Sequence, residues 1–325
     1  MKGIDRVYGN FEINEPVILE LINSKTLQRL KDIAQGEYFK SHSLKTTFSR
    51  FEHSIGVYLL LKTYGAPIEE QIAGLIHDVS HTVFSHCTDY ISDADSEKEQ
   101  NCHDKIFDEF VRKSEIPEIL KKYNLNLDYI LDDKNFPLKE KDLLDLCADR
   151  IDYGLRTAIF HKKIKNGKYF INNLLAENKQ WVFKDFESAE KYAKLFLNLN
   201  TKFWSSLSLT VISRNVGDFL WHALSKNYIS KTDLYTTDKI VLEKIKPHIK
   251  TDSKLSLLFD KMNNKGSFRN NPKSYDVIVF CKSRVVDPLC LHKGKIKRVS
   301  DIDLKWKSII KQESKPKKYF LEFGR

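Results

Sequence analysis

The sequence has few of the features that mark membrane-bound, disulfide-stabilised or repetitive proteins. No stretch approaches the roughly 20 uninterrupted apolar residues that a membrane-spanning helix needs, and the first residues lack the apolar core of a signal peptide. The five cysteines are odd in number and none stands in a CxxC pair, so neither a disulfide framework nor a cysteine zinc site is indicated. There is no internal repeat and no low-complexity segment. We therefore expect a soluble globular protein without membrane contact, located in the cytoplasm.

Charge is distributed unevenly along the 325 residues. Residues 226–325 hold 24 Lys and Arg against 11 Asp and Glu, whereas residues 1–225 hold 30 against 33. Such asymmetry is typical of contact with phosphates or nucleic acid. The alternative is a lysine-rich solvated surface, which is favoured for most of these lysines because apolar residues are interspersed among them.

Apolar residues at helical spacing dominate the first two thirds of the chain. They predict helices before residue 35 and over the ranges 53–63, 106–111, 143–159, 187–206 and 211–224. Residues 124–137 are rich in Asn and Asp and predict a loop or short turns. Strand composition appears at 275–280, 284–286 and 319–323. We expect a mainly α fold, with a helical body over residues 1–225 and a basic C-terminal α+β appendage over residues 226–325 that carries a small mixed or antiparallel β element.

Gly74 to His81 is the stretch with the densest group of potential metal ligands. Taken as a helix at about 100° per residue, it places apolar side chains on one face and His77, Asp78 and His81 on the other. Imidazole nitrogen and carboxylate oxygen suit Zn, Mn, Fe or Ni better than Ca. The His77-Asp78 dipeptide alone is weak evidence for a metal site, because the chain contains a second His-Asp dipeptide, His103-Asp104.

The neighbouring stretches make the pair more specific. Arg50 to Val57 reads R-F-E-H-S-I-G-V, His77 to His86 reads H-D-V-S-H-T-V-F-S-H, and Asp149 to Tyr153 reads D-R-I-D-Y. Together they resemble the HD-domain phosphohydrolase superfamily, and within it the branch of deoxynucleoside-triphosphate triphosphohydrolases. Residues 3–9 and 27–30 are similar to the N-terminal helix of that branch, and residues 283–288 to a segment late in its chains.

The order of His, His-Asp and a distant Asp implies the ligands of one divalent ion. The proposed set is His53, His77, Asp78 and Asp149, and Mn, Fe, Ni, Co, Zn or Mg are all open as the metal. The alternative is that these are buried polar groups satisfied by hydrogen bonds. Such an ion acts as a Lewis acid on phosphorus and lowers the pKa of a bound water.

By resemblance, four further residues line the reaction centre: His81, His86, Asp89 and His103. In the related enzymes a His–Asp pair orients the imidazole that handles protons, so Asp89 with His103 is the expected pair and His86 the candidate acid. The alternative for each of these histidines is that its imidazole supports the site from behind or packs in the core. We interpret Phe203, Trp204, Phe219 and Trp221 as core residues.

Substrate contacts are expected from Arg50, Arg150, Tyr153 and Gln35. The two guanidinium groups match phosphate geometry and keep their charge at physiological pH. Gln35-Gly36 resembles a Gln-Leu-Gly shortened by one residue, and Thr157 stands where the triphosphohydrolases place an Asp that reads the sugar hydroxyl together with that glutamine. The resemblance therefore supports the metal site more strongly than it supports specificity for deoxynucleotides.

Three functions are compatible with these patterns. The first is a metal-dependent phosphohydrolase acting on a nucleotide, including a deoxynucleoside triphosphate. The second applies the same chemistry to nucleic acid or another phosphodiester through the basic last third. The third is a regulator that binds a nucleotide without turning it over, which the presence of all four ligand types disfavours. Relatives of this branch assemble, so we expect a homo-oligomer.

Overall fold

The structure is a computed structural model that describes residues 1–36, 48–91, 97–98, 100–263 and 265–324. Helices account for 55% of the described residues and strands for 14%, which confirms the expected mainly α class. The helices of the first half are α1 (Pro16–Asn23), α2 (Lys25–Arg29), α3 (Arg50–Thr63), α4 (Ile68–Ile76), α6 (Cys102–Arg112), α7 (Ile116–Lys122), α8 (Leu127–Leu131) and α9 (Ala148–Phe160). Those of the second half are α10 (Lys168–Asn172), α11 (Phe186–Leu199), α12 (Leu207–Ser225), α13 (Asp238–Ile245), α14 (Ser253–Met262), α15 (Val299–Ile302) and α16 (Leu304–Glu313).

The strands of the described residues form three small sheets. Their bounds are β1 (Lys2–Asp5), β2 (Gly9–Glu12), β3 (Leu174–Glu177), β4 (Gln180–Phe183), β5 (Phe268–Asn270), β6 (Val277–Cys281), β7 (Leu289–His292), β8 (Lys295–Arg298) and β9 (Lys317–Phe323). β1 pairs with β2, the order β3-β4-β7-β8 makes a mixed sheet, and β5-β9-β6 is antiparallel. Because β4 pairs with β7, the mixed sheet joins a strand before residue 225 to a strand after it. The domain division at that residue stays a prediction.

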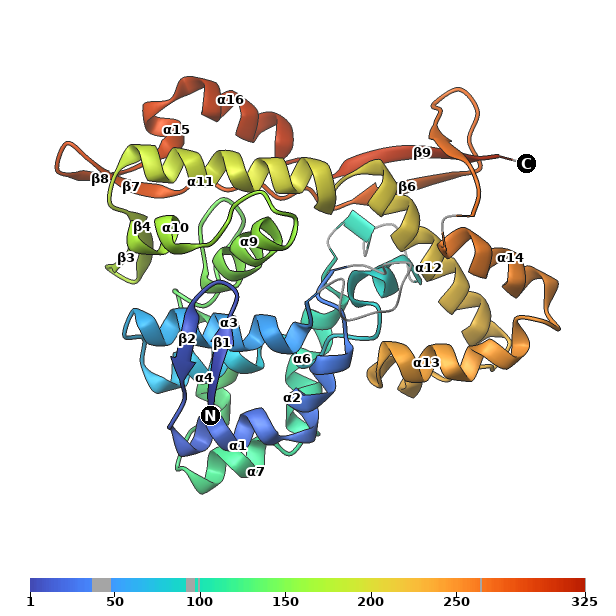
Figure 1. Ribbon diagram of the computed structural model, residues 1–325, viewed down its shortest axis with the longest axis horizontal. Coiled ribbons are helices and arrows are strands. Elements are labelled where there is room, and N and C mark those ends of the chain that lie inside the picture. Colours follow the sequence, from blue (N-terminus) through green and yellow to red (C-terminus); the bar gives the residue numbers. More distant parts are fainter. Residues whose placement is uncertain (37–47, 92–96, 99, 264, 325) are drawn as a thin grey trace.

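Helices α3, α4 and α9 form the centre of the helical body (Figure 1). A capping box fixes the start of α3, because the Ser49 hydroxyl accepts from the backbone N–H of Glu52 and the Glu52 carboxylate accepts from that of Ser49. Gly65, in the left-handed region at φ 71°, and Pro67 turn the chain into α4. A Cβ on Gly74 would lie 2.4 Å from Cδ1 of Leu61, so the small residue lets α3 and α4 approach closely.

The helix predicted over Gly74 to His81 is wrong beyond Ile76. Residues 77–80 form turns, in which the N–H groups of Val79 and His81 donate to carbonyls three residues earlier, those of Ile76 and Asp78. After the turn, Phe84 and Ser85 adopt positive φ values of 55° and 50°. The chain then continues as a 3-10 segment, Ser85–Ile91. His77, Asp78 and His81 therefore lie on an irregular segment held by contacts with other parts of the chain.

Several other expectations require correction. Residues 2–12 form the hairpin β1–β2 and not an N-terminal helix, with Gly9 at φ 79° in its turn. Residues 284–286 are not a strand, since only a single bridge joins Leu144 to Val286. The helix predicted from residue 143 begins at Ala148, whereas the region 124–137 holds the short helix α8 and a 3-10 turn. The strands predicted near 275–280 and 319–323 are present as β6 and β9.

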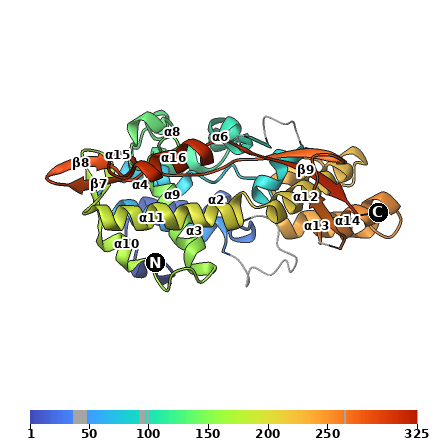
Figure 2. The ribbon, with the colours of Figure 1, turned by 90° about the horizontal axis from the view of Figure 1, so that it is seen from above.

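Figure 2 shows α11 running along the molecule, with the C-terminal strands and helices above it. Two large clusters of buried apolar side chains form the core around α3, one with α9 and α11, the other with α1, α4 and α7. The cysteine side chains at 87, 147, 281 and 290 are buried. Among the residues described, no helix combines the length and apolar character needed to cross a membrane.

Gly217 sets the distance between α12 and the 3-10 segment Ser85–Ile91. A Cβ at this position would lie 2.7 Å from Cβ of Tyr90 and 3.1 Å from the carbonyl oxygen of Cys87. Because a backbone atom is involved, Gly217→Ala should lower the free energy of unfolding by about 1–3 kcal/mol despite the better helix propensity of alanine. Urea denaturation measures this change. Ser208→Ala on the exposed side of α12 is the control, and equal stability of the two variants would contradict the packing described.

Candidate metal centre and active site

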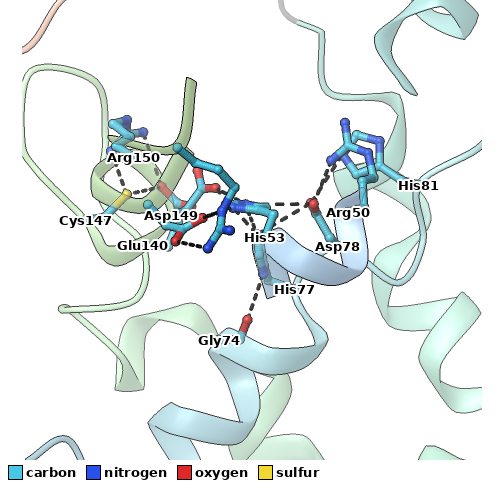
Figure 3. Close-up of polar contacts among 12 residues, drawn as sticks. Arg50, His53, Gly74, His77, Asp78, His81, Glu140, Cys147, Asp149 and Arg150 are labelled. Carbon is cyan, nitrogen blue, oxygen red and sulfur yellow. Dashed lines mark hydrogen bonds and ion pairs between the residues drawn. The ribbon is translucent and has the colours of Figure 1, made fainter. Parts of the chain in front are cut away.

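The four proposed metal ligands converge at one point from α3, the turn after α4, and α9 (Figure 3). Nε2 of His53 lies 2.9 Å from Oδ1 of Asp149 and 3.2 Å from Nε2 of His77. Nε2 of His77 is in turn 3.5 Å from Oδ1 of Asp149 and 3.5 Å from Oδ1 of Asp78. The structure thus brings together the complete set that the sequence predicts.

The second nitrogen of each imidazole is already used. Nδ1 of His53 lies 2.7 Å from Oδ2 of Asp152, and Nδ1 of His77 lies 2.8 Å from the carbonyl oxygen of Gly74. Both partners are acceptors, so each Nδ1 carries a proton, and each ring presents an Nε2 lone pair once it is in its neutral form. Two lone pairs then face one another beside the carboxylates of Asp78 and Asp149. Such a group of acceptors fits a cation, and imidazole with carboxylate is a usual donor set for a divalent ion.

The negative charge of the site also favours the binding of a cation. Burial opposes protonation of His53, but its hydrogen bonds to Asp149 and Asp152 raise its pKa to about 9. Burial alone would raise the pKa of Asp78, yet the Arg50 guanidinium keeps it well below its usual range. The negative charge gathered here therefore attracts either an additional proton or a metal ion, and the ion displaces the proton when it binds.

Asp152 is the functional residue that motif reading did not assign. It is fully buried and also accepts two hydrogen bonds from Arg156, each 2.9 Å long. Arg156 forms a second ion pair with Asp5 at 2.9 Å. A carboxylate on the far nitrogen of a ligating histidine fixes the ring orientation and its tautomer. The available signal was the spacing of Asp149 and Asp152, which places both carboxylates on adjacent parts of one helix face.

The predicted proton-transfer residues lie beside the ligands. Nε2 of His81 is 3.3 Å from Oδ1 of Asp78, and its ring stacks on that of His103 at 3.7 Å between centroids. The expected pairing of Asp89 with His103 stays a prediction, and the contact that the structure describes is with His86, whose Nδ1 donates to Oδ2 of Asp89 at 3.0 Å. Helix α6 presents its histidine to His81, whereas His86 and Asp89 face each other three residues apart in the 3-10 segment.

Burial lowers the pKa of all three of these imidazoles. That of His103 falls to about 3, and those of His81 and His86 also lie below the usual value, with the charge of Arg50 as a further cause. The rings are therefore neutral at physiological pH. For His86 this changes the expected role, since a neutral ring that donates from Nδ1 to Asp89 presents Nε2 as a proton acceptor and must gain a proton before it acts as an acid.

The two predicted phosphate-binding arginines differ in their surroundings. Arg50 contacts Asp78 at 2.6 Å and Ser85 at 2.8 Å, and its buried Nη2 has no hydrogen-bond partner among the residues that the structure describes. Arg150 instead contacts Glu140 at 3.2 Å, the Cys147 sulfur at 3.2 Å and backbone carbonyls of the preceding loop. Both line the cavity over the metal centre. Arg50 is the better placed of the two to bind a phosphate oxygen.

Two adjoining cavities meet at the site. A polar one of about 740 Å³ contains the ligands His77, Asp78 and Asp149, and a smaller one of about 280 Å³ has largely aromatic and aliphatic walls. The residues that line both are Gln35, His86, Tyr153 and Arg284. The walls of the smaller cavity include Phe48, Thr157, Phe160, His161, Phe203, Trp204, Leu209 and Ile212.

The cavity walls include residues that the sequence did not assign. Phe203 and Trp204 border the smaller cavity and so are not only core residues. Phe219 is fully buried, as expected, whereas Trp221 is 52% exposed. Lys282 and Arg284 reach the polar cavity from the segment after β6. The resemblance of residues 283–288 to a family segment was the one signal for this placement.

Comparison with known proteins agrees with this geometry. The HD domain model matches residues 50–156. The uncharacterized protein YdhJ of Bacillus subtilis is 37% identical over 261 residues, 79% of each chain. The metal-dependent phosphohydrolase cns2 of Cordyceps militaris is 30% identical over 210 residues, 62% of this chain and 60% of that one.

More distant similarity adds to these matches. Chicken deoxynucleoside triphosphate triphosphohydrolase SAMHD1 is 30% identical over 146 residues, 38% of this chain but only 23% of its own length. The crystal structure of a phosphohydrolase from Bacteroides thetaiotaomicron has the same fold, with a TM-score of 0.75 at 17% identity over the full length of both chains.

The fold and the site thus define a metal-dependent phosphohydrolase that uses a divalent ion. The chain belongs to the HD-domain family, in the part of it that resembles the deoxynucleoside triphosphate triphosphohydrolases.

Proposed function

We propose that the protein hydrolyses a nucleotide, including a deoxynucleoside triphosphate, by attack of water at phosphorus. The observation that carries this proposal is the contact between the two cavities through Gln35, His86, Tyr153 and Arg284. The polar cavity suits phosphates because it contains the ligands and several cationic side chains. The smaller cavity suits a planar organic group because aromatic side chains form much of its wall.

The ion held by His53, His77, Asp78 and Asp149 would polarise a phosphoryl oxygen and supply an activated water. The chain's own groups divide the remaining work. The partnerless Nη2 of Arg50 points to a role in binding phosphate oxygens. His86, oriented by Asp89, accepts a proton at Nε2 and later returns it to the leaving oxygen. His81 and His103 are neutral and form a stacked pair that can donate or accept hydrogen bonds without adding charge.

Nucleic-acid contact through the basic residues 226–325, self-assembly into a homo-oligomer and substrate binding by Arg150 stay predictions. A regulator without turnover is disfavoured because all four ligands and the carboxylate behind His53 are present in one arrangement.

The direct test is product analysis with metal-stripped protein. Mn, Fe, Co, Ni, Zn and Mg are added separately to mixtures with nucleoside and deoxynucleoside mono-, di- and triphosphates, cyclic nucleotides and single-stranded oligonucleotides. We expect phosphate, pyrophosphate or triphosphate to be released from a nucleotide with at least one metal. Cleavage of oligonucleotides alone would move the substrate to nucleic acid, and lack of turnover with every metal and substrate would contradict the proposal.

Lys282 supplies a prediction with a pH signature. Burial, together with the neighbouring Arg284, lowers its pKa to about 8. Its ammonium therefore binds phosphate below pH 8 and loses its charge as the pH rises through that value. Below pH 8, Lys282→Ala should raise KM about 10-fold or more, which is the effect expected from the loss of a hydrogen bond to a charged group. In this variant KM should also rise less steeply with pH than in the wild type. Lys305→Ala on α16 is the control, and an unchanged KM profile in Lys282→Ala would contradict a phosphate contact.

A further inference from the structure

The turn that carries Asp78 and His81 is held by a residue outside the metal centre, Arg29 at the end of α2. Its Nη2 donates to the carbonyl oxygens of Val79 at 2.7 Å and His81 at 2.8 Å. Its Nη1 donates to the carbonyl oxygen of Thr236 at 3.2 Å. One guanidinium thus connects the second half of the turn 77–81 to the segment before α13.

The turn needs partners of this kind because it lies beyond the end of α4. Carbonyl groups at and beyond the end of a helix have no N–H donor within the helix. They must therefore accept hydrogen bonds from other parts of the chain. Asp78 directly precedes Val79, so its position depends on how the carbonyl groups of Val79 and His81 are held. A shift of the turn would move the Asp78 oxygen away from His77 and the His81 ring away from Asp78.

The segment before α13 makes a second connection to the same region. Oδ1 of Asp238 accepts from the N–H of Phe84 at 2.7 Å and Oδ2 from that of Ala34 at 3.3 Å, while the N–H of Val83 donates to the carbonyl of Leu234 at 2.9 Å. Phe84 is one of the two residues with positive φ after the turn. A non-glycine residue keeps such a conformation only where its surroundings hold it.

Arg29 also contacts the helix that carries His103. Its guanidinium carbon lies 5.6 Å from the ring centroid of Phe110 on α6. The three hydrogen-bond partners of the Arg29 guanidinium are neutral carbonyl groups. Burial, together with the positive charge of Arg50, lowers the pKa of Arg29. The residue therefore lies where the turn, α6 and the segment before α13 meet.

We propose that Arg29 is a positioning residue of the metal centre, which holds the turn 77–81 so that Asp78 and His81 remain aligned with His77. The proposal rests on the metal centre described above, and it assigns Arg29 no contact with substrate. Lysine cannot reproduce the fork that reaches three carbonyls, although it keeps the charge.

The test compares Arg29→Lys with Arg214→Lys, a matched change in an arginine on α12 that pairs with Asp218 and Glu97 away from the ligands. The dissociation constant for Mn²⁺ is measured by the EPR signal of the free ion, together with kcat, KM and Tm. In Arg29→Lys we expect Mn²⁺ binding to weaken about 10- to 100-fold, as when other groups behind metal ligands are changed. At saturating Mn²⁺, kcat should fall while KM stays within about twofold, whereas Arg214→Lys should match the wild type. Wild-type Mn²⁺ affinity and kcat in folded Arg29→Lys would overturn the proposal.

Asp238→Asn provides the second variant if Arg29→Lys does not fold. It loses one of the two carboxylate acceptors that hold Ala34 and Phe84, and it should weaken Mn²⁺ binding in the same direction. Wild-type affinity and kcat in Asp238→Asn would then overturn the proposal. Failure of the metal centre itself is distinguishable, because the wild type would not bind Mn²⁺. Failure of the proposed substrate is distinguishable as well, because Mn²⁺ binding can be compared without any turnover.

Discussion

His77→Ala abolishes metal binding and phosphate release together, while the far-UV circular dichroism and Tm remain close to those of the wild type. The imidazole is the ligand whose Nε2 faces both Asp78 and Asp149, and its loss leaves the ion without one of its two nitrogen donors. Because Lewis-acid catalysis contributes several kcal/mol to the transition state, the rate should fall by about 10³-fold or more. Metal content by inductively coupled plasma mass spectrometry and phosphate release are measured on the same preparation.

His292→Ala is the matched control for this change. Its ring lies on β7 against Phe186, outside the residues that line either cavity. The control should keep both metal and activity, so that a loss confined to His77→Ala cannot come from the removal of any imidazole. Turnover at the wild-type rate in His77→Ala would remove His77 from the metal centre.

Arg156→Leu should cause the largest loss of stability. The guanidinium binds both oxygens of Asp152 and also Asp5, all in the core, and its removal leaves two carboxylates buried without their cation. Breaking a buried pair in this way costs about 3–5 kcal/mol. We expect a decrease of that size in the free energy of unfolding from urea denaturation, together with weaker metal binding because Asp152 no longer orients His53.

Arg112→Leu offers a close comparison within the same chain. Arg112 also binds both oxygens of an aspartate four residues away, Asp108, but its side chain is 44% exposed. Solvent screens this pair, and many such pairs contribute nothing measurable. The urea midpoint of Arg112→Leu should therefore equal that of the wild type. Equal midpoints for the two leucine variants would show that burial of the Arg156 pair has no energetic consequence.

The sequence predicted which side chains meet at the candidate metal centre better than it predicted the backbone that holds them. The order of His53, His77, Asp78 and Asp149 and the residues around them carry the chemistry, and such local motifs are visible in the primary structure. The helix over 74–81 was wrong because apolar periodicity reports only local preference. Arg29 holds the turn after α4 and Asp238 holds the backbone of Phe84 that follows it, and both residues are distant from the turn in sequence.

The same reason explains the residues that were missed or misassigned. Lys282 enters the polar cavity from a segment whose distance in sequence from the ligands gives no information on proximity. The partner of Asp89 could not be chosen between His86 and His103 from spacing, because the choice depends on how the 3-10 segment and α6 pack. Trp204 was interpreted as core because an aromatic residue at helical spacing looks the same beside a cavity and within a core.

The central claim is that one divalent ion binds between His53, His77, Asp78 and Asp149. Its most direct test is an anomalous difference map from crystals soaked in Mn²⁺, collected at a wavelength where manganese scatters anomalously. We expect one strong peak within coordination distance of the two Nε2 atoms and the two carboxylates. A map without a peak at this position, or with its main peak at another group of side chains, would contradict the metal centre described above.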